Sequence, residues 1–465
     1  MAMGKRRDVQ EELFVSTASL QSPGHPFYEA LSRLLDDNGF DRVVEEACAP
    51  FYAESRGRRS IPPGVYFRML FVGYFEGIES ERALCWRCAD SLSLRQFLGL
   101  GMHESVLDHS SLSVIRGRLA PHVFDEVFHF VLDLVSSEGL LRGREVGIDS
   151  SLMEANASMR SLTRRDDGSS YHEYIRKITA ESTGDPTPTS GDVRRADRKR
   201  KGKRVSNREW EAKADPDARI TRMKNGSTRL AYKPEHAVDL ETGVVLAATL
   251  NRADQSDHQT LLETLDELEG NLEHLDRELD SPCLVADKGY HSDGVFERCE
   301  QDGFTSYIAE PRHPQKRNWK NKTDGDERRR RLYGNRRRLR GNRSRKLMRK
   351  RRCENERSFA HVMQRGGWKR THLRGRENNW KPYLVQVAAH NLSVLLRNVL
   401  GAGTPKALRA ALGSSIAMSA RFSATIMRAC GWKGRRRAPK ATATIHEPHR
   451  TSSQNSIRRR YSTAC

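Results

Sequence analysis

Two stretches of the sequence, Val146-Gly-Ile-Asp149 and Leu284-Val-Ala-Asp287, share one pattern: a short apolar run that ends in an aspartate. Each run has the length and composition of a buried β-strand. In α/β sheets, side chains at the carboxyl ends of the strands line the ligand-binding crevice. If the two strands are neighbours, Asp149 and Asp287 converge. This pair of runs therefore decides both the fold and the position of the site that we expect.

The segments around these runs predict the rest of a mixed α/β domain. A hairpin is expected over residues 232–250, because two β-rich runs flank the turn Glu241-Thr-Gly243. Residues 304–309 form another β-rich run, and amphipathic patterns predict helices over residues 256–275, around 295–296, over 354–361 and over 383–399. This order is typical of a mixed sheet that is flanked by helices. Residues 160–213 are polar and charged and contain Pro, Gly and Ser, so we expect a loop or flexible arm there.

Residues 26–141 are predicted to be mostly helical. Apolar residues recur at spacings of three and four from Val123 to Val135, and Asp108 is placed as an N-cap before a short helix. Several short helices with basic ends suit a helix-turn-helix-like DNA-binding domain, although helix bundles of any purpose give the same pattern. Residues 1–25 are expected to form an N-terminal arm.

The positive charge of the chain is concentrated in two segments. Lys and Arg number 81 against 60 Asp and Glu, which gives a formal net charge of +21. Residues 312–352 carry 20 Lys or Arg with three acids, and residues 401–465 carry 13 with one. Such segments usually bind polyanions, because each phosphate that they neutralise releases condensed counterions. We interpret 312–352 as a basic insertion that covers DNA, and 401–465 as a basic, disordered tail.

Composition argues against several other classes of protein. The chain has no run of about 18 apolar residues, which argues against a membrane span. Its first residues lack the apolar core of a secretory signal, so a cytoplasmic location is expected. The eight cysteines are too sparse for a disulfide scaffold, and the pair Cys85 and Cys88 is interpreted as two buried or half-buried thiols on a helix rather than a zinc site.

The two aspartates suggest a divalent cation. Two carboxylates that lie close together repel each other unless a cation neutralises them, and ligands that are all oxygen suit Mg²⁺ or Mn²⁺. A third acid is expected from a helix packed beside the strands. Spacing alone leaves three candidates for it: Glu356, Glu377 and Glu354.

A second group, His236, Asp257 and His258, suggests a transition-metal site instead. His236 falls within a predicted strand, however, and Asp257 and His258 begin a predicted helix, where capping is the simpler role. We therefore favour the structural interpretation for these three residues.

Taken together, the motifs resemble those of DDE transposases of bacterial insertion sequences. The resemblance covers roughly residues 25–400 and rests on the following stretches: Leu94-Arg-Gln-Phe-Leu-Gly-Leu100, Asp108-His-Ser-Ser-Leu112, Gly147-Ile-Asp-Ser-Ser-Leu-Met-Glu-Ala-Asn156, Tyr232-Lys-Pro-Glu-His-Ala-Val-Asp239, Ala286-Asp-Lys-Gly-Tyr290, Glu356-Arg-Ser-Phe-Ala-His-Val362, Leu373-Arg-Gly-Arg-Glu377 and Ala388-Ala-His-Asn-Leu392.

The resemblance implies a fold, an activity and a catalytic triad. The fold is an RNase H-like (retroviral-integrase-like) catalytic domain over residues 142–400, preceded by the helical domain. In that family two Asp and one Glu hold two Mg²⁺ or Mn²⁺ ions. The family's Arg-x-x-x-Glu spacing fits Arg352 and Glu356, so the resemblance selects Glu356 beside Asp149 and Asp287. The implied reaction is cleavage and transfer of DNA strands by in-line phosphoryl transfer.

The resemblance also implies partners. These are double-stranded DNA, both the terminal inverted repeats of the element and the target, and a second copy of the chain in a homodimer or larger synaptic assembly at the nucleoid. The side chains expected to contact DNA are Lys288, Tyr290, Arg336, Arg337, Arg352 and Lys369.

The sequence departs from the family pattern at two positions. Arg349 stands where a Tyr is common, and Met363 stands where a Lys is common, so Lys369 or Arg370 would have to supply the phosphate contact of that Lys. These departures motivate one alternative, a catalytically impaired, transposase-derived DNA-binding protein. An unrelated metal-dependent nuclease is the other alternative.

Overall fold

The computed structural model describes residues 24–53, 60–101, 104–201, 205–280, 282–312 and 325–411. All of them belong to one compact unit. The predictions for the N-terminal arm up to residue 23, for residues 313–324 of the basic insertion and for the tail beyond residue 411 lie outside these ranges.

The N-terminal part of the described chain is helical, as predicted. Asp108 is the N-cap of one of the helices, and its carboxylate accepts a hydrogen bond from the backbone N–H of Ser110 at 2.9 Å. Proline occupies the first turn of several others, where its missing N–H costs nothing. The elements are α1 (Pro26–Asp37), α2 (Phe40–Cys48), η1 (Ala49–Phe51), α3 (Pro63–Glu76), α4 (Glu81–Asp90), α5 (Leu92–Phe97), α6 (His109–Arg118) and α7 (Pro121–Ser137).

A mixed sheet follows, which makes the fold α/β as expected. Its five main strands are β1 (Glu145–Ser150), β6 (Thr228–Asp239), β7 (Val245–Arg252), β8 (Cys283–Ala286) and β9 (Thr305–Ile308). They lie in the order β7-β6-β1-β8-β9, in which β1, β8 and β9 are parallel and β6 and β7 antiparallel to their neighbours. The first half of β6 also pairs with β2 (Met153–Glu154) and β5 (Arg219–Arg222). The predicted hairpin and strands are confirmed.

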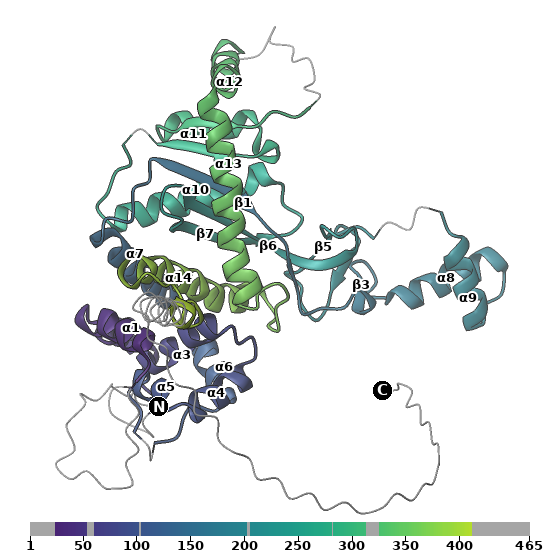
Figure 1. Ribbon diagram of the computed structural model, residues 1–465. Helices are drawn as coiled ribbons and strands as arrows, with labels where there is room; N and C mark the ends of the chain where they lie inside the picture. Colours follow the sequence, from purple (N-terminus) through teal and green to yellow (C-terminus); the bar gives the residue numbers. More distant parts are fainter. Residues whose placement is uncertain are drawn as a thin grey trace, which may run out of the picture. The chain divides into compact units, whose positions relative to one another are not determined.

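Helices cover both faces of the sheet, and two neighbouring residues of β6 show which helices cover each face. Glu235 faces α10 (Asp257–His274), where Thr260 and Thr264 donate to its carboxylate. His236 faces α13 (Asn342–Phe359) and α14 (Arg376–Leu400), bonding to Ser358 and Tyr383. α13 crosses this second face in front of β1 (Figure 1). η3 (Lys288–Tyr290) follows β8 and leads to α11 (Asp293–Gln301), which packs on β9.

Gly147 on β1 lets α13 approach the sheet closely. The side-chain amide of Asn355 donates to the carbonyl of Gly147 at 3.0 Å. A Cβ at position 147 would stand 2.6 Å from Oδ1 of Asn355 and 2.4 Å from Cδ2 of Leu240. Any larger residue would therefore have to displace the side chains of Leu240 and Asn355.

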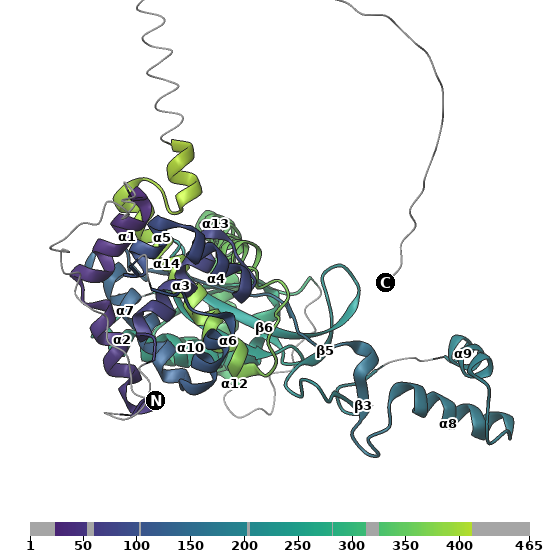
Figure 2. The same cartoon turned by 90° about the horizontal axis from the view of Figure 1, so that it is seen from below.

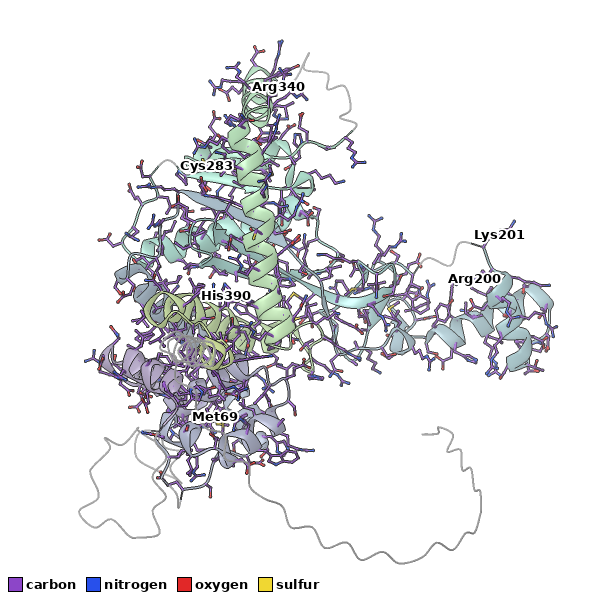
Figure 3. All side chains as sticks on the ribbon, in the orientation of Figure 1. Met69, Arg200, Lys201, Cys283, Arg340 and His390 are labelled. Carbon is purple, nitrogen blue, oxygen red and sulfur yellow. The ribbon has the colours of Figure 1, made fainter. Side chains whose placement is uncertain are left out.

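The N-terminal helices and the α/β region share one hydrophobic core. α14 packs against α3 and α7 as well as β7, and Figure 2 shows these helices gathered around it. At their contact the hydroxyl of Tyr74 lies 3.5 Å from Nδ1 of His390, whose position on α14 is labelled in Figure 3. The core therefore fixes the helical part against the sheet.

The prediction of a loop over residues 160–213 was wrong. This segment contains η2 (Met159–Ser161), β3 (Leu162–Arg164), α8 (Tyr171–Thr183), α9 (Ser190–Lys199), which ends just before the labelled Arg200 and Lys201 of Figure 3, and β4 (Trp210–Ala212). Ser170 and Glu173 form a capping box at the start of α8. Trp210 is buried beside Tyr171 and Tyr174, so a small apolar cluster stabilises a segment that is polar overall.

The described part of the basic insertion is helical. α12 (Gly325–Leu339) and α13 meet near Arg340, which Figure 3 labels, and α13 begins twelve residues before the helix predicted from residue 354. Arg and Lys favour helices, and Leu332 and Leu347 are buried on these two helices. η4 (Ala360–Arg365) then continues α13 as a π-helical turn.

The start of the predicted disordered tail is ordered as well. Ala402, Gly403 and Thr404 are buried, and the hydroxyl of Ser393 donates to the carbonyl of Gly403 at 2.7 Å. The boundary of the predicted tail at residue 401 was therefore too early. Within the ranges that the structure describes, none of the helices has the length and apolarity needed to cross a membrane.

Candidate active site

Asp149 and Asp287 stand at the same level of two neighbouring parallel strands. Val146 pairs with Leu284 and Gly147 pairs with Val285, so the register carried three residues beyond the first pair sets Asp149 beside Asp287. Side chains at matching positions of a parallel pair point to the same face of the sheet. Among the five main strands, Asp149 lies on the first and Asp287 directly follows the fourth. The charge of Asp287 acts on Asp149, so the two carboxylates lie near each other, as the two apolar runs predict.

Arg351 on α13 balances the charge of Asp149. Its Nη1 lies 3.2 Å from Oδ2 of Asp149 and donates to the carbonyl of Ile148 at 3.2 Å. Burial raises the pKa of Asp149, the guanidinium of Arg351 opposes that rise, and the nearby charge of Asp287 adds to it. Arg352 was predicted from the sequence to contact DNA, whereas Arg351 was not singled out. In the sequence, Arg351 lies four residues after Leu347 and four residues before Asn355, which are both buried. This spacing places Arg351 on the face of α13 that meets the sheet.

Gly289 brings a third aspartate close to Asp287. The carboxylate of Asp287 accepts a hydrogen bond from the N–H of Gly289 at 2.9 Å. A Cβ on Gly289 would stand 2.0 Å from Oδ2 of Asp257 and 3.2 Å from Oδ1 of Asp287. The two carboxylates therefore face each other across a residue that has no side chain. Asp257 is the first residue of α10, and its carboxylate also makes contacts outside this helix.

A polar network anchors Asp257. Its Oδ1 lies 2.6 Å from Nζ of Lys233, whose side chain is 5% exposed, and it accepts a hydrogen bond from the hydroxyl of Ser150 at 3.3 Å. Lys233 also donates to Oγ1 of Thr260 at 3.1 Å. Because Ser150 follows Asp149 directly, this network connects α10 with the end of β1.

Glu235 extends this network to Tyr290, in the turn that follows Asp287. Its carboxylate accepts hydrogen bonds from the hydroxyls of Thr260, Thr264 and Tyr290 at 2.7–2.8 Å. Burial raises the pKa of Glu235 to about 7, against the lowering effect of these hydrogen bonds and of Lys233. The sequence analysis did not single out Glu235 or Lys233; both lie on β6, within the stretch that resembles the family.

The hydrogen bond to Glu235 corrects the prediction for Tyr290. Its side chain is 1% exposed, and its hydroxyl donates to Glu235, so the ring cannot reach a phosphate or a base. Tyr290 instead fixes the turn that follows Asp287.

The three candidates for a third acid lie in different places. Glu354 accepts a hydrogen bond from Arg357. Its Oε2 is 3.1 Å from the point where a Cβ on Gly243, in the β6–β7 turn, would stand. This turn lies at the opposite end of β1 from Asp149, so Glu354 is far from the two aspartates. Glu377 pairs with Lys381 at 2.7 Å in the first turns of α14.

Glu356 lies on α13, the helix that packs on the face of the sheet to which Asp149 points. It is exposed, and its side chain makes no hydrogen bond or ion pair with the residues that the structure describes. Within those residues no group of three His, Cys, Asp or Glu side chains is gathered closely enough to hold a metal ion. The structure therefore brings the two aspartates together and leaves Glu356 apart from them.

The other predicted DNA contacts differ in accessibility. Lys288, Arg337, Arg352 and Lys369 are exposed. Arg336 is half-buried, and its guanidinium makes a bidentate contact of 2.8–3.0 Å with the carboxylate of Glu310. Arg336 would have to leave Glu310 before it could bind a phosphate.

The burial of Met363 explains one departure from the family pattern, the absence of a Lys at this position. The side chain is 5% exposed and packs in the main core, close to the start of η4. A lysine at this position would point into the core, whereas Lys369 and Arg370 are exposed.

Neither alternative metal site is assembled in the described residues. Both ring nitrogens of His236 are taken by Ser358 and Tyr383, and burial lowers the pKa of His236 to about 3, so the ring is neutral. Cys85 and Cys88 are buried thiols on α4, as interpreted from the sequence.

Two family models match the chain. The transposase domain (DUF772) matches residues 15–118, and the transposase DDE domain matches residues 176–392. Together they span more than half of the 465 residues. The second match contains Asp287 and Glu356 but begins after Asp149, which the sheet register sets beside Asp287. No curated protein and no solved structure matches the chain.

Proposed function

The chain belongs to the DDE transposases of insertion sequences, and from this premise we propose that it cleaves DNA at the ends of its element and joins those ends to a target. One observation carries the proposal: Asp149 and Asp287 stand side by side at the carboxyl ends of two parallel strands. This is the edge of an α/β sheet at which ligands bind. The sheet around them supports an RNase H-like catalytic domain.

The donor atoms at this edge fit Mg²⁺ or Mn²⁺. Asp149 and Asp287 offer carboxylate oxygens; burial raises the pKa of Asp149, and the neighbouring charge of Asp287 adds to that rise. Asp149, Asp287 and Glu356 would hold the metal. Two such ions, when bound, would supply an activated nucleophile and stabilise the leaving 3′-oxygen of an in-line displacement.

The chain's own residues would position the reacting DNA. Asp149 and Asp287 are held by Arg351 and by the N–H of Gly289, so their carboxylates are fixed before substrate arrives. Lys288, exposed directly after Asp287, would contact a phosphate of the strand, and the exposed Arg337, Arg352 and Lys369 would contact others. Glu356 would have to turn or shift toward the pair when metal and DNA bind.

We propose double-stranded DNA as the partner of this site. The N-terminal helices would recognise the terminal repeats. A dimer or larger assembly would hold two ends at once, at the nucleoid, since two ends must be joined. These steps require no covalent protein–DNA intermediate, and therefore no Ser or Tyr nucleophile.

Strand cleavage tests the proposal. Duplexes that carry the ends of the element are incubated with the protein and Mg²⁺, and nicked and joined products are separated on denaturing gels. We expect cleavage by the native chain and none by Asp287→Asn, with DNA binding retained in both. Cleavage that persists in Asp287→Asn would disprove the assignment.

The exposed position of Glu356 favours one alternative, a DNA-binding protein that has lost catalysis. It predicts binding to the ends with a steep dependence on salt but no nicking at any Mg²⁺ or Mn²⁺ concentration. Measuring binding and nicking on the same duplex separates the two functions.

A further inference from the structure

The loop between η4 and α14 lies next to the proposed catalytic edge. The strand β2 begins four residues after Asp149, and this loop runs along it: the N–H of Glu154 donates to the carbonyl of Lys369 at 3.0 Å, and the N–H of Thr371 donates to the carbonyl of Glu154 at 2.9 Å. The loop is thereby attached to the chain segment that leaves the end of β1.

Further contacts hold the loop in one conformation. The side-chain amide of Asn156 donates to the carbonyl of His372 at 2.7 Å, and Nε of Arg374 donates to the carbonyl of Asn156 at 3.3 Å. The N–H of Gly375 donates to Oδ1 of Asp215 at 3.1 Å. Ordering this loop on binding would therefore cost little entropy.

The surface of this loop and of its neighbours is rich in cations. Lys369, Arg370, His372 and Arg374 are exposed along the loop, and Arg160 and Arg229 are exposed on the segments opposite. Arg370 and Arg229 are 61% and 52% exposed, and both approach the single carboxylate of Glu154 at 3.8 Å. One carboxylate between two guanidinium groups leaves a net positive charge.

Three hollows in the surface meet at this loop. Their volumes are about 490, 540 and 500 Å³. The first and the third share Arg370, the second and the third share Arg374, and the first and the second share His372. Neighbouring hollows therefore share lining residues; we call the surface around them the arginine groove and define it by Arg160, Arg229, Arg370, His372 and Arg374.

We infer that the arginine groove binds the phosphate backbone of the DNA that Asp149 and Asp287 would cut. This inference rests on the proposed function and adds to it the path that the DNA takes. A polyanion complements the excess of guanidinium groups, which bind phosphate oxygens in bidentate geometry. The groove is attached to the segment after Asp149, so bound DNA would continue to the proposed catalytic edge.

The salt dependence of DNA binding tests the inference. The full chain and the triple variant Arg160→Gln/Arg370→Gln/Arg374→Gln are titrated onto a labelled duplex at several NaCl concentrations, and binding is followed by fluorescence anisotropy. Each phosphate contact that is lost should reduce the slope of log K against log salt by about 0.9. We expect the slope of the triple variant to fall by at least about 0.9, which corresponds to one lost phosphate contact, and its cleavage to be slower.

Two control variants remove the same number of positive charges elsewhere. Arg194→Gln/Arg198→Gln/Lys199→Gln changes exposed residues of α9, which do not line the three hollows. Arg329→Gln/Arg345→Gln/Arg349→Gln changes exposed residues of α12 and α13 that are not among the proposed DNA contacts. A thermal melt of each variant checks that the fold is retained.

The outcomes separate the inference from the proposed function. A slope that is reduced in the groove variant but not in the α9 variant supports the inference. Equal slopes in all three variants, or a reduction only in the α12–α13 variant, overturn it, and the proposed function stands if the native chain still binds and cleaves. Failure of the native chain to bind DNA would overturn the proposed function itself.

Discussion

The guanidinium of Arg351 contacts the carboxylate of Asp149, with 3.2 Å between Nη1 and Oδ2. Arg351 comes from α13 and Asp149 from β1, so this contact joins the helix that carries Glu356 to the strand that carries the first aspartate. The guanidinium supplies positive charge where a cation is proposed to bind.

Replacement of Arg351 should shift the pH dependence of cleavage. Burial raises the pKa of Asp149, and Arg351 acts against that rise, so Arg351→Gln should raise this pKa further. A carboxylate must be deprotonated to hold a metal ion. The acidic limb of the pH–rate profile should therefore move to higher pH in Arg351→Gln and much less in Arg351→Lys, which keeps the charge. Identical limbs in the three proteins would contradict this role.

Two glutamates can be compared directly as the third acid. Glu356→Gln should reduce Mg²⁺-dependent cleavage more than about 100-fold, since loss of an outer-shell partner alone costs 10–100-fold at metal sites. Its stability should change by less than about 0.5 kcal/mol, because the exposed side chain has no ion-pair partner among the described residues.

The matched variant is Glu377→Gln. It removes the carboxylate that pairs with Lys381, a buried residue on α14, whereas Glu377 itself is exposed. We expect cleavage at the native rate and a loss of stability of about 1–3 kcal/mol, because the buried ammonium group of Lys381 loses its charged partner. Gel assays of cleavage and urea denaturation measure both properties. Loss of cleavage in Glu377→Gln with retention in Glu356→Gln would reverse the assignment.

Gly289 provides a steric test of the site. A Cβ there would stand 2.0 Å from Oδ2 of Asp257, so Gly289→Ala must displace this carboxylate and disturb its contacts with Lys233 and Ser150. We expect cleavage to fall at least about tenfold while DNA binding is kept. Gly294→Ala on α11 is the control, because nothing lies within 4 Å of its Cβ position. If both variants cleaved alike, Asp257 would have no part in the site.

The sequence predicted those parts of the molecule that depend on local patterns. Asp149 and Asp287 were found because each ends an apolar run, and the pairing of two such runs follows from sheet geometry. The start of α6 was found because Asp108 is a cap that acts within two residues. Periodicity and capping act over a few residues, so they are visible in the sequence.

Features that depend on distant partners were missed. The hydroxyl of Tyr290 bonds to Glu235, 55 residues away, so an exposed contact with DNA was predicted for a buried ring. The loop predicted over residues 160–213 contains helices, because Trp210 supplies an apolar partner for Tyr171 and Tyr174 far from it in sequence. Arg351 was passed over for Arg352, since only the packing of α13 shows which of the two faces Asp149.

Glu235 should make the stability of the protein depend on pH. Its pKa is about 7 in the folded protein, because the side chain is buried, against 4.5 for an ordinary glutamate. The folded state therefore binds this proton more tightly, and its stability should decrease as pH rises from about 4.5 to about 7, by on the order of 3 kcal/mol from this group. Glu235→Gln cannot titrate, so the difference in unfolding free energy between variant and native protein should change in favour of the variant over that interval.

Urea denaturation at pH 5 and pH 7.5 measures this difference in unfolding free energy. Glu267 has a similarly raised pKa and is unchanged in both proteins, so it cancels from the comparison. A difference that is the same at both pH values would mean that Glu235 remains ionised, held by Lys233 and its three hydroxyl donors.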